Sequence, residues 1–271
     1  MIVPFIKMHG LGNDFVVLDA RTQALPPMTS RLAAALADRK TGIGCDQLIL
    51  LEPSDRADLR MRIFNADGGE VEACGNASRA VGLLLGETGT IETLGGLLAT
   101  EACVDGIRID MGEPRFGWDE IPLAYPLDTL SMPVGWEDLD SPAAVNVGNP
   151  HVVFFVPDCQ AVDLARLGPL IEHDPLFPGR VNVNVATVVR PAAIGLRVWE
   201  RGVGETRACG TGACATAIAA MRRGLADRAG VTVTLPGGPL RIEWTSANRI
   251  LMTGPAVESF RGTFDSAAYG A

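Results

Sequence analysis

The chain has 271 residues, 47% of them hydrophobic and 20% charged, which is the balance of a globular protein with one large domain or two modest ones. Its net charge of −9, with no cluster of Lys and Arg, argues against a nucleic-acid partner. Lys7 and His9 interrupt the first apolar run, and no stretch reaches the roughly 18–20 apolar residues of a membrane helix, so we expect neither a signal peptide nor a membrane contact.

The first half of the chain is predicted to consist of short strands and two helices. Strands are predicted at residues 5–9, 14–19, 47–51, 59–64, 90–93, 97–102 and 106–111. One helix is predicted over 31–39, with Ser30 as its N-cap. A second helix is predicted over 77–85, shortly after a turn at 65–69 and Cys74.

The second half is predicted to repeat this order. The stretch 112–142, rich in Pro, Gly and Trp, is interpreted as the crossing between the halves. Strands are predicted at residues 149–156, 182–189, 194–199, 231–235, 240–244 and 250–253, and helices at 164–172 and 213–223. We therefore predict an α+β fold with two pseudo-symmetric β-rich domains, each with mostly antiparallel strands wrapped around a central helix. The predicted domains are residues 1–117 with 263–271, and residues 118–262.

An internal repeat supports this division. Residues 62–80 recur without a gap at 197–215, and seven of the nineteen aligned positions are identical. The identical pairs are Arg62/Arg197, Gly69/Gly204, Glu70/Glu205, Ala73/Ala208, Cys74/Cys209, Gly75/Gly210 and Ala80/Ala215. Gly12-Asn13 also aligns with Gly148-Asn149, Gln47 with Asn182, and Asn65 with Glu200, all at offsets of 135 or 136. Such a constant offset indicates a duplicated half.

Each repeat places a cysteine, Cys74 or Cys209, between a glycine-rich turn and a helix of small residues. A helix start binds anions and lowers the pKa of a thiol, and a neighbouring glycine lets a ligand approach the backbone. Two such elements facing each other would hold a carboxylate and flank its α-carbon with two sulfurs. This pattern suits inversion of that carbon, with one thiolate as base and the opposite thiol as acid.

Eight motifs, in order along the chain, resemble those of the diaminopimelate epimerase family. They are residues 8–15, 42–47, 62–72, 74–76, 148–151, 180–182, 199–202 and 205–214. The chain departs from the commonest pattern at Ala77-Ser78-Arg79-Ala80, where Gly-Ala-Arg-Cys is more usual, and at Asn146-Val147, where Ser-Met is familiar. Neither departure affects a matched catalytic position.

The resemblance implies an isomerase that converts LL-2,6-diaminopimelate to the meso form without a cofactor or metal, for lysine and peptidoglycan synthesis. It also implies a homodimer, and a two-domain fold whose C-terminal residues return to the first domain. Cys74 and Cys209 match the acid/base pair, and His151 and Glu200 match residues that tune it. The matched substrate-binding set is Asn13, Gln47, Asn65, Gly75, Asn76, Asn149, Asn182, Glu200, Arg201, Gly210 and Thr211. Within this set, Arg201 would clamp the distal carboxylate.

Other interpretations stay open from the residues alone. A proline or hydroxyproline racemase would also use two cysteines, but would not need the asparagine set or Arg201. A thiol redox protein would depend on a reversible Cys74–Cys209 disulfide, whereas an epimerase would be inhibited by one. The six cysteines have no disulfide framework or CxxC spacing, so we expect reduced thiols and a cytoplasmic protein. No metal-ligand cluster, nucleotide loop or Schiff-base lysine is indicated.

Overall fold

A computed structural model describes residues 1–72 and 74–269. Its contacts divide the chain into two compact units. The N-terminal unit comprises Met1–Ile109 together with the chain from Gly254 onward, and the C-terminal unit comprises Asp110–Thr253.

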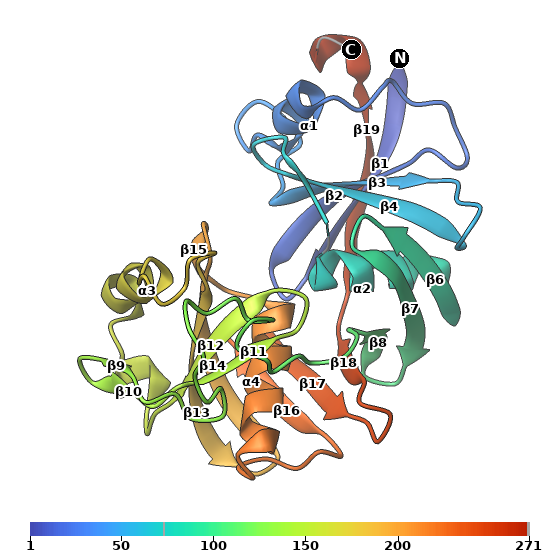
Figure 1. Cartoon of the computed structure of the whole chain (residues 1–271). Helices are drawn as coiled ribbons and strands as arrows, with labels where there is room; N and C mark the ends of the chain where they lie inside the picture. The colour runs from blue at the N-terminus through green and yellow to red at the C-terminus, as the bar shows by residue number, and fades with distance from the viewer. Residues whose placement is uncertain (73, 270–271) are drawn as a thin grey trace. The chain divides into compact units, whose positions relative to one another are not determined.

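The N-terminal unit is built on one mixed sheet (Figure 1). Its strands are β1 (Ile2–Gly10), β2 (Asn13–Asp19), β3 (Gln47–Glu52), β4 (Leu59–Asn65), β5 (Glu70–Val71), β6 (Thr88–Thr93), β7 (Gly96–Cys103), β8 (Gly106–Asp110) and β19 (Val257–Asp265). Along the order β1-β2-β3-β4-β6-β7-β8 the pairs are antiparallel, except for β2/β3 and β4/β6, which are parallel. β5 pairs antiparallel with the end of β4, and β19 pairs antiparallel with β1. The helices are α1 (Ser30–Ala37), α2 (Gly75–Leu85) and the 3-10 turn η2 (Ser266–Tyr269).

The C-terminal unit has the same topology. Its strands are β9 (Gly135–Trp136), β10 (Leu139–Asp140), β11 (Ala143–Asn146), β12 (Pro150–Phe155), β13 (Asn182–Arg190), β14 (Ala193–Glu200), β15 (Gly204–Thr206), β16 (Val231–Leu235), β17 (Gly238–Trp244) and β18 (Ile250–Gly254). Along β11-β12-β13-β14-β16-β17-β18, only β12/β13 and β14/β16 are parallel. The helices are α3 (Leu164–Glu172), α4 (Gly210–Arg222) and the 3-10 turn η1 (Cys159–Ala161). The predicted α+β fold with two similar β-rich halves is confirmed.

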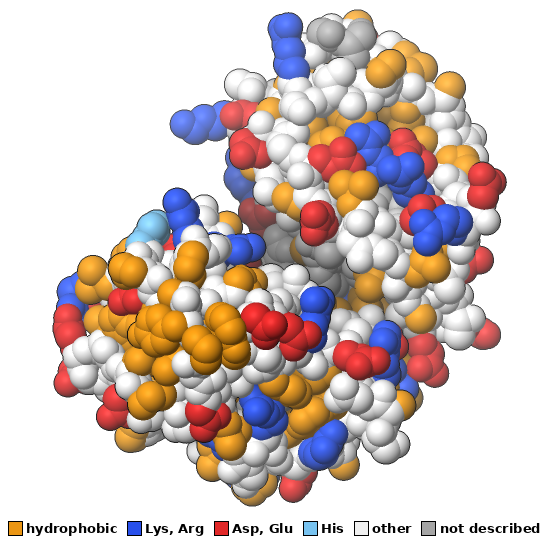
Figure 2. Space-filling model, in the orientation of Figure 1, with side chains coloured by type: hydrophobic (Ala, Val, Ile, Leu, Met, Phe, Trp, Pro, Cys, Tyr) orange, Lys and Arg blue, Asp and Glu red, His pale blue; other side chains and the backbone are white. Residues whose placement is uncertain are grey.

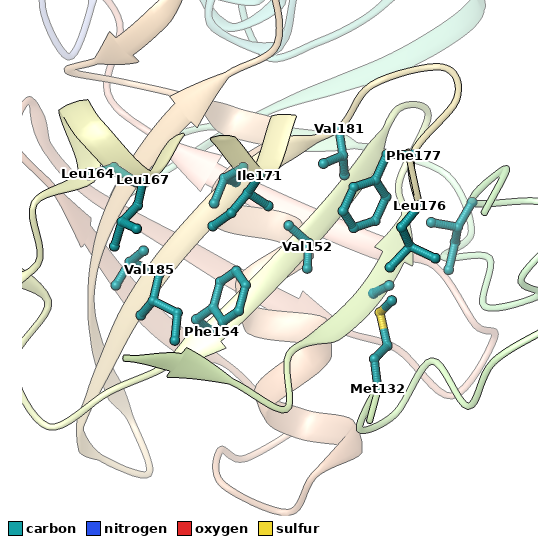
Figure 3. Packing of buried hydrophobic residues seen from close by; sticks show 14 of the residues in the cluster. Met132, Val152, Phe154, Leu164, Leu167, Ile171, Leu176, Phe177, Val181 and Val185 are labelled. Carbon is teal, nitrogen blue, oxygen red and sulfur yellow. The ribbon is translucent and has the colours of Figure 1, made fainter. Parts of the chain in front are cut away.

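Both faces of each central sheet are covered, which follows from alternation along the strands. In the N-terminal unit Val16 and Leu18 pack in the cluster that contains α1 residues, while Phe15 and Val17 pack with α2 residues. In the C-terminal unit Val152 and Phe154 pack with α3 residues (Figure 3), and Val153 packs with Ala219 of α4. Helix α4 is buried along nearly its whole length because its Gly and Ala residues let the strands approach closely.

Three local predictions differ from the structure. The N-cap of α1 is Thr29, whose Oγ1 accepts from Leu32 N at 3.2 Å, and Ser30 is the first helical residue. Helices α2 and α4 begin directly after the cysteines, two or three residues earlier than predicted, because glycines at a helix start hide the apolar periodicity. The segment 112–142 contributes Ile121, Leu123, Met132 and Leu139 to the core around α3, so it is more than a crossing.

On the face shown in Figure 2, Lys and Arg side chains are interspersed with Asp and Glu. Among the described residues, no helix is long and apolar enough to cross a membrane.

Candidate active site

Three candidate residues of the N-terminal unit lie at one edge of its sheet. Asn13 and Gln47 are the first residues of the parallel strands β2 and β3, and Asn65 is the last residue of the antiparallel strand β4. Gln47 and Asn65 are paired across the two strands, and Gln47 Nε2 donates to Asn65 Oδ1 at 3.0 Å. The strand directions therefore bring together three amides that are up to 52 residues apart in the sequence.

Cys74 stands at the N-cap of α2, half-buried beside these amides. Its Sγ donates to Asn13 Oδ1 at 3.8 Å, and Asn76 Nδ2 donates to the same oxygen at 3.2 Å. The fully buried Arg79 in turn donates from Nη2 to Asn76 Oδ1 at 2.7 Å. Cys74, Asn13 and Asn76 thus form one hydrogen-bonded group at the start of α2.

The C-terminal unit gathers the matching residues at the equivalent edge. Asn149 directly precedes β12, Asn182 begins β13, and Glu200 ends β14. The side chain of Asn182 forms hydrogen bonds with two backbone groups. Its Nδ2 donates to Pro150 O at 2.9 Å, and its Oδ1 accepts from Arg201 N at 2.9 Å. The exposed Arg201 side chain donates from Nη1 to Gly179 O at 2.8 Å. Asn182 therefore fixes the backbone of the turn that carries Arg201.

The backbone preceding the two aligned asparagines is also repeated. Gly12 and Gly148 both have left-handed conformations, with φ of 87° and 107°. A Cβ at either position would meet no atom within 4 Å. The conformation, and not the space, therefore favours glycine at both positions.

Cys209 stands at the N-cap of α4 and is almost fully buried, with 3% of its surface exposed. Its Sγ accepts from Gly212 N at 3.3 Å and lies 3.5 Å from Thr211 Oγ1. A Cβ at position 212 would lie 2.9 Å from Val198 Cγ2 and 3.2 Å from the sulfur. Only glycine at 212 allows β14 and the sulfur to pack this closely against the first turn of α4.

The pKa of Cys209 is raised well above its ordinary value, first by burial and then by the charge of Glu200. Hydrogen bonds from Thr211 and Gly212 act in the opposite direction but are outweighed. The prediction that the helix start lowers the thiol pKa is therefore wrong for Cys209. Burial also raises the pKa of Glu200, against hydrogen bonds from Thr206 and Cys209. A basic carboxylate thus lies within hydrogen-bonding reach of a weakly acidic thiol.

His151 is fully buried, and burial lowers its pKa to about 3, so the ring is neutral at neutral pH. Its Nε2 lies 2.9 Å from Asn149 Oδ1, and Asn149 Nδ2 donates to Thr211 Oγ1 at 3.3 Å. His151 is therefore linked to Cys209 through Asn149 and Thr211. Its other nitrogen, Nδ1, lies 3.1 Å from Asn184 Nδ2. Asn184 was not among the residues predicted from the sequence, although the strand alternation places it on the same face of β13 as Asn182.

Glu172, the last residue of α3, was also missed. Only 2% exposed, it accepts from Trp199 Nε1 at 2.8 Å and from Gly202 N at 2.9 Å, and it lies 3.6 Å from Arg180 Nη1. Burial alone would raise the pKa of Glu172, but these hydrogen bonds hold it below its ordinary value. Glu172 thus secures both ends of the turn that contains Glu200 and Arg201.

Within residues 1–72 and 74–269, no group of three or more His, Cys, Asp or Glu residues could hold a metal ion.

Comparison with known proteins identifies the family. The family described as diaminopimelate epimerase matches residues 5–117 and 143–258. A diaminopimelate epimerase of Erythrobacter litoralis is 70% identical over 269 residues, covering 99% of this chain and 100% of the relative. The enzyme of the same name from Rhizorhabdus wittichii is 65% identical over 271 residues, covering 100% of this chain and 98% of the relative.

Solved structures share the fold at much lower identity. A Bacillus anthracis phenazine biosynthesis protein of the PhzF family has a TM-score of 0.70 at 18% identity, covering 98% of this chain and 99% of its own. A hydroxyproline epimerase from Agrobacterium vitis has a TM-score of 0.66 at 16% identity, covering 98% and 93%. The match to the family over most of the chain, and to its members over the whole chain, shows that this chain belongs to the diaminopimelate epimerase family.

Proposed function

We propose that Cys74 and Cys209 are the acid/base pair with which this member of the diaminopimelate epimerase family converts LL-2,6-diaminopimelate to the meso form, in the synthesis of lysine and peptidoglycan precursors. The observation that carries the assignment is the equivalent position of the two cysteines. Each is the N-cap of the helix that follows a two-stranded hairpin, β4/β5 or β14/β15, in one of two halves with the same topology.

Inversion of an α-carbon requires proton removal from one face and proton delivery to the other. A thiolate takes the α-proton as the C–H bond breaks, and the electron pair delocalises onto the carboxylate. The second thiol then gives its proton to the opposite face, which leaves it as the thiolate. Backbone N–H groups at Gly75-Asn76 and Gly210-Thr211 stabilise the carboxylate charge, because the first N–H groups of a helix have no acceptor within the helix. The scheme needs no cofactor.

Glu200 and His151 act on the thiol of Cys209 in different ways. Glu200, with a raised pKa, is a base near enough to accept the thiol proton when the thiolate forms. His151 is neutral and acts through Asn149, which it orients toward Thr211.

The remaining residues bind substrate. The substrate-binding set is Asn13, Gln47, Asn65, Gly75, Asn76, Asn149, Asn182, Glu200, Arg201, Gly210 and Thr211. Gln47 Oε1 is buried and lacks a hydrogen-bond partner among the described residues, so it offers an acceptor for a substrate ammonium. Arg201 clamps the distal carboxylate, and Asn182 holds its backbone in place.

We also propose a cytoplasmic homodimer. The resemblance to the family supports the dimer, and the need for reduced thiols supports a reducing compartment. Sedimentation of the pure protein should give twice the chain mass of 28.6 kDa.

The test of the reaction is incubation of reduced, metal-free protein with LL-diaminopimelate in D2O. Conversion to the meso form, with deuterium at the inverted carbon, is expected. Conversion of proline or hydroxyproline instead would keep the two-thiol scheme and change the substrate. Activity that requires a confirmed Cys74–Cys209 disulfide would favour a redox function, whereas the epimerase should be reversibly inhibited by that disulfide.

A further inference from the structure

A continuous series of hydrogen bonds connects Asn184, deep in β13, with the sulfur of Cys209. The links are Asn184 Nδ2 to His151 Nδ1 at 3.1 Å, His151 Nε2 to Asn149 Oδ1 at 2.9 Å, Asn149 Nδ2 to Thr211 Oγ1 at 3.3 Å, and Thr211 Oγ1 to Cys209 Sγ at 3.5 Å. All five residues belong to the C-terminal unit.

The donors in this series all point the same way. A neutral imidazole donates from one nitrogen and accepts at the other, so donation from Asn184 to Nδ1 places the ring proton on Nε2. Nε2–H then donates to Asn149 Oδ1, and Asn149 donates from its amide nitrogen to Thr211. Because the Thr211 hydroxyl accepts this bond, its single hydrogen is available for the sulfur of Cys209. Donors aligned in this way polarise one another and stabilise a thiolate at the end of the series.

Stability of the fold does not explain the amide of Asn184. The side chain is fully buried, and among the described residues its Oδ1 has no hydrogen-bond partner. An unsatisfied buried oxygen is destabilising. The oxygen lies against the first turn of α4. A Cβ at Gly212 would be 3.2 Å from Asn184 Oδ1 and 3.2 Å from Cys209 Sγ.

The N-terminal unit has an apolar residue at the position equivalent to Asn184. The strand register makes Ile49 the counterpart of Asn184: Ile49 pairs with Val17 and Ile63, and Asn184 pairs with Val153 and Val198. Ile49 is fully buried in the apolar cluster around α2. An apolar side chain is therefore compatible with this place in the fold.

We propose that Asn184 is a positioning residue for Cys209: by donating to Nδ1 of His151 it fixes the ring tautomer, and through Asn149 it directs the Thr211 hydroxyl at the sulfur. The inference rests on the proposed function, in which Cys209 must become a thiolate. The amide nitrogen of Asn184 forms its hydrogen bond with the ring of His151, so Asn184 acts on the sulfur through the series.

The first test determines the tautomer of His151 by NMR in the unaltered protein. The chain has three histidines, so 15N-histidine labelling gives a simple NMR spectrum, in which His151→Phe assigns the ring of interest. We expect protonated Nε2 and unprotonated Nδ1 in His151, unchanged near neutral pH. A proton on Nδ1 would reverse the direction of every link and overturn the proposal.

The second test removes the donor with Asn184→Ile, the residue of the equivalent position, and with the smaller Asn184→Ala in case the first does not fold. We expect a mixed His151 tautomer, and a kcat and a Cys209 alkylation rate each lowered between about twofold and tenfold, the effect of one neutral hydrogen bond, with little change in KM. Thr187→Val is the matched control: it removes the strand hydroxyl that accepts from Cys159 N at 2.7 Å, and should leave the tautomer and the alkylation unchanged.

A folded Asn184 variant with an unchanged Cys209 alkylation rate would overturn the proposal, even if the protein is an active epimerase. Conversely, a protein that shows the expected tautomer and alkylation but does not convert LL-diaminopimelate would leave the series intact and refute the proposed function.

Discussion

The layers beneath the two cysteine-bearing helices differ in polarity although the strands that form them are equivalent. Beneath α2, Phe15 and Ile49 belong to an apolar cluster. Beneath α4, the same register positions hold His151 and Asn184, which form hydrogen bonds to each other. The two halves share their strand pairing, but at these two register positions one half has an apolar pair and the other a hydrogen-bonded polar pair.

The cysteines differ accordingly. Sγ of Cys74 donates to an amide oxygen, an arrangement that favours the thiol. Sγ of Cys209 accepts from Gly212 N, an arrangement that favours the thiolate, although burial and Glu200 oppose it. A reaction that needs one acid and one base can therefore use two like groups in unlike surroundings.

The largest effect should come from removing either sulfur. Cys74→Ala and Cys209→Ala should each lower epimerisation by about a thousandfold or more, since each removes one acid/base group. Formation of the meso form with deuterium at the inverted carbon measures the loss, and circular dichroism should show that the fold is unchanged. Near-normal turnover in either variant would rule out the two-base scheme.

The next effect concerns the free energy of unfolding and arises from the buried His151 of the C-terminal unit. The pKa of His151 is about 3 in the folded chain against an ordinary value of 6.5, so between these values the unfolded chain binds more protons. Its contribution to stability is complete above about pH 6.5 and is lost as pH falls, by about 3 kcal/mol between about pH 7.5 and pH 4.5.

Urea unfolding at the two pH values measures this loss. The double variant His151→Phe with Asn184→Ile copies the apolar layer of the other half and should lack this component of the pH dependence. An identical pH dependence in both proteins would show that His151 is not held neutral.

A smaller effect should follow from Glu172→Gln. Glu172 ends α3 and accepts hydrogen bonds from Trp199 and Gly202, on either side of Glu200 and Arg201. The equivalent last residue of α1 is the apolar Ala37, which has no carboxylate to hold a turn in this way. Loss of the charge should raise KM for diaminopimelate between about tenfold and a hundredfold, the range for hydrogen bonds to a charged group, with a smaller change in kcat. Glu137→Gln, at an exposed ion pair with Arg166, is the control. An unchanged KM would mean that the turn is held without Glu172.

The smallest effects should have opposite signs in the two halves. Thr211→Val removes a donor from Cys209 and should slow its alkylation, whereas Asn13→Ala removes an acceptor from Cys74 and should speed its alkylation. Each change should be between about twofold and tenfold. Mass spectrometry of the alkylated peptides measures both rates in one sample, and changes of the same sign would contradict the difference between the two helix starts.

The sequence alone was sufficient for the duplicated fold, because the repeat preserves glycines and asparagines at turns that set the strand order. It was not sufficient for Asn184 and Glu172, whose hydrogen-bond partners lie 27 or more residues away in the chain. Asn184 stands in a valine-rich strand, and only the register shows that it faces His151. The roles of the site residues and the domain boundaries at 117/118 and 262/263 stay predictions.

The pairing of β19 with β1 bears on the order in which the chain matures during synthesis. Ile2 is paired with Asp265, so this edge of β1 stays uncovered until residues 257–265 have been made. Residues 110–253 emerge earlier, and the C-terminal unit therefore has all its strands first. The half that is translated first is completed last, and until then β1 presents an open edge that other chains can pair with.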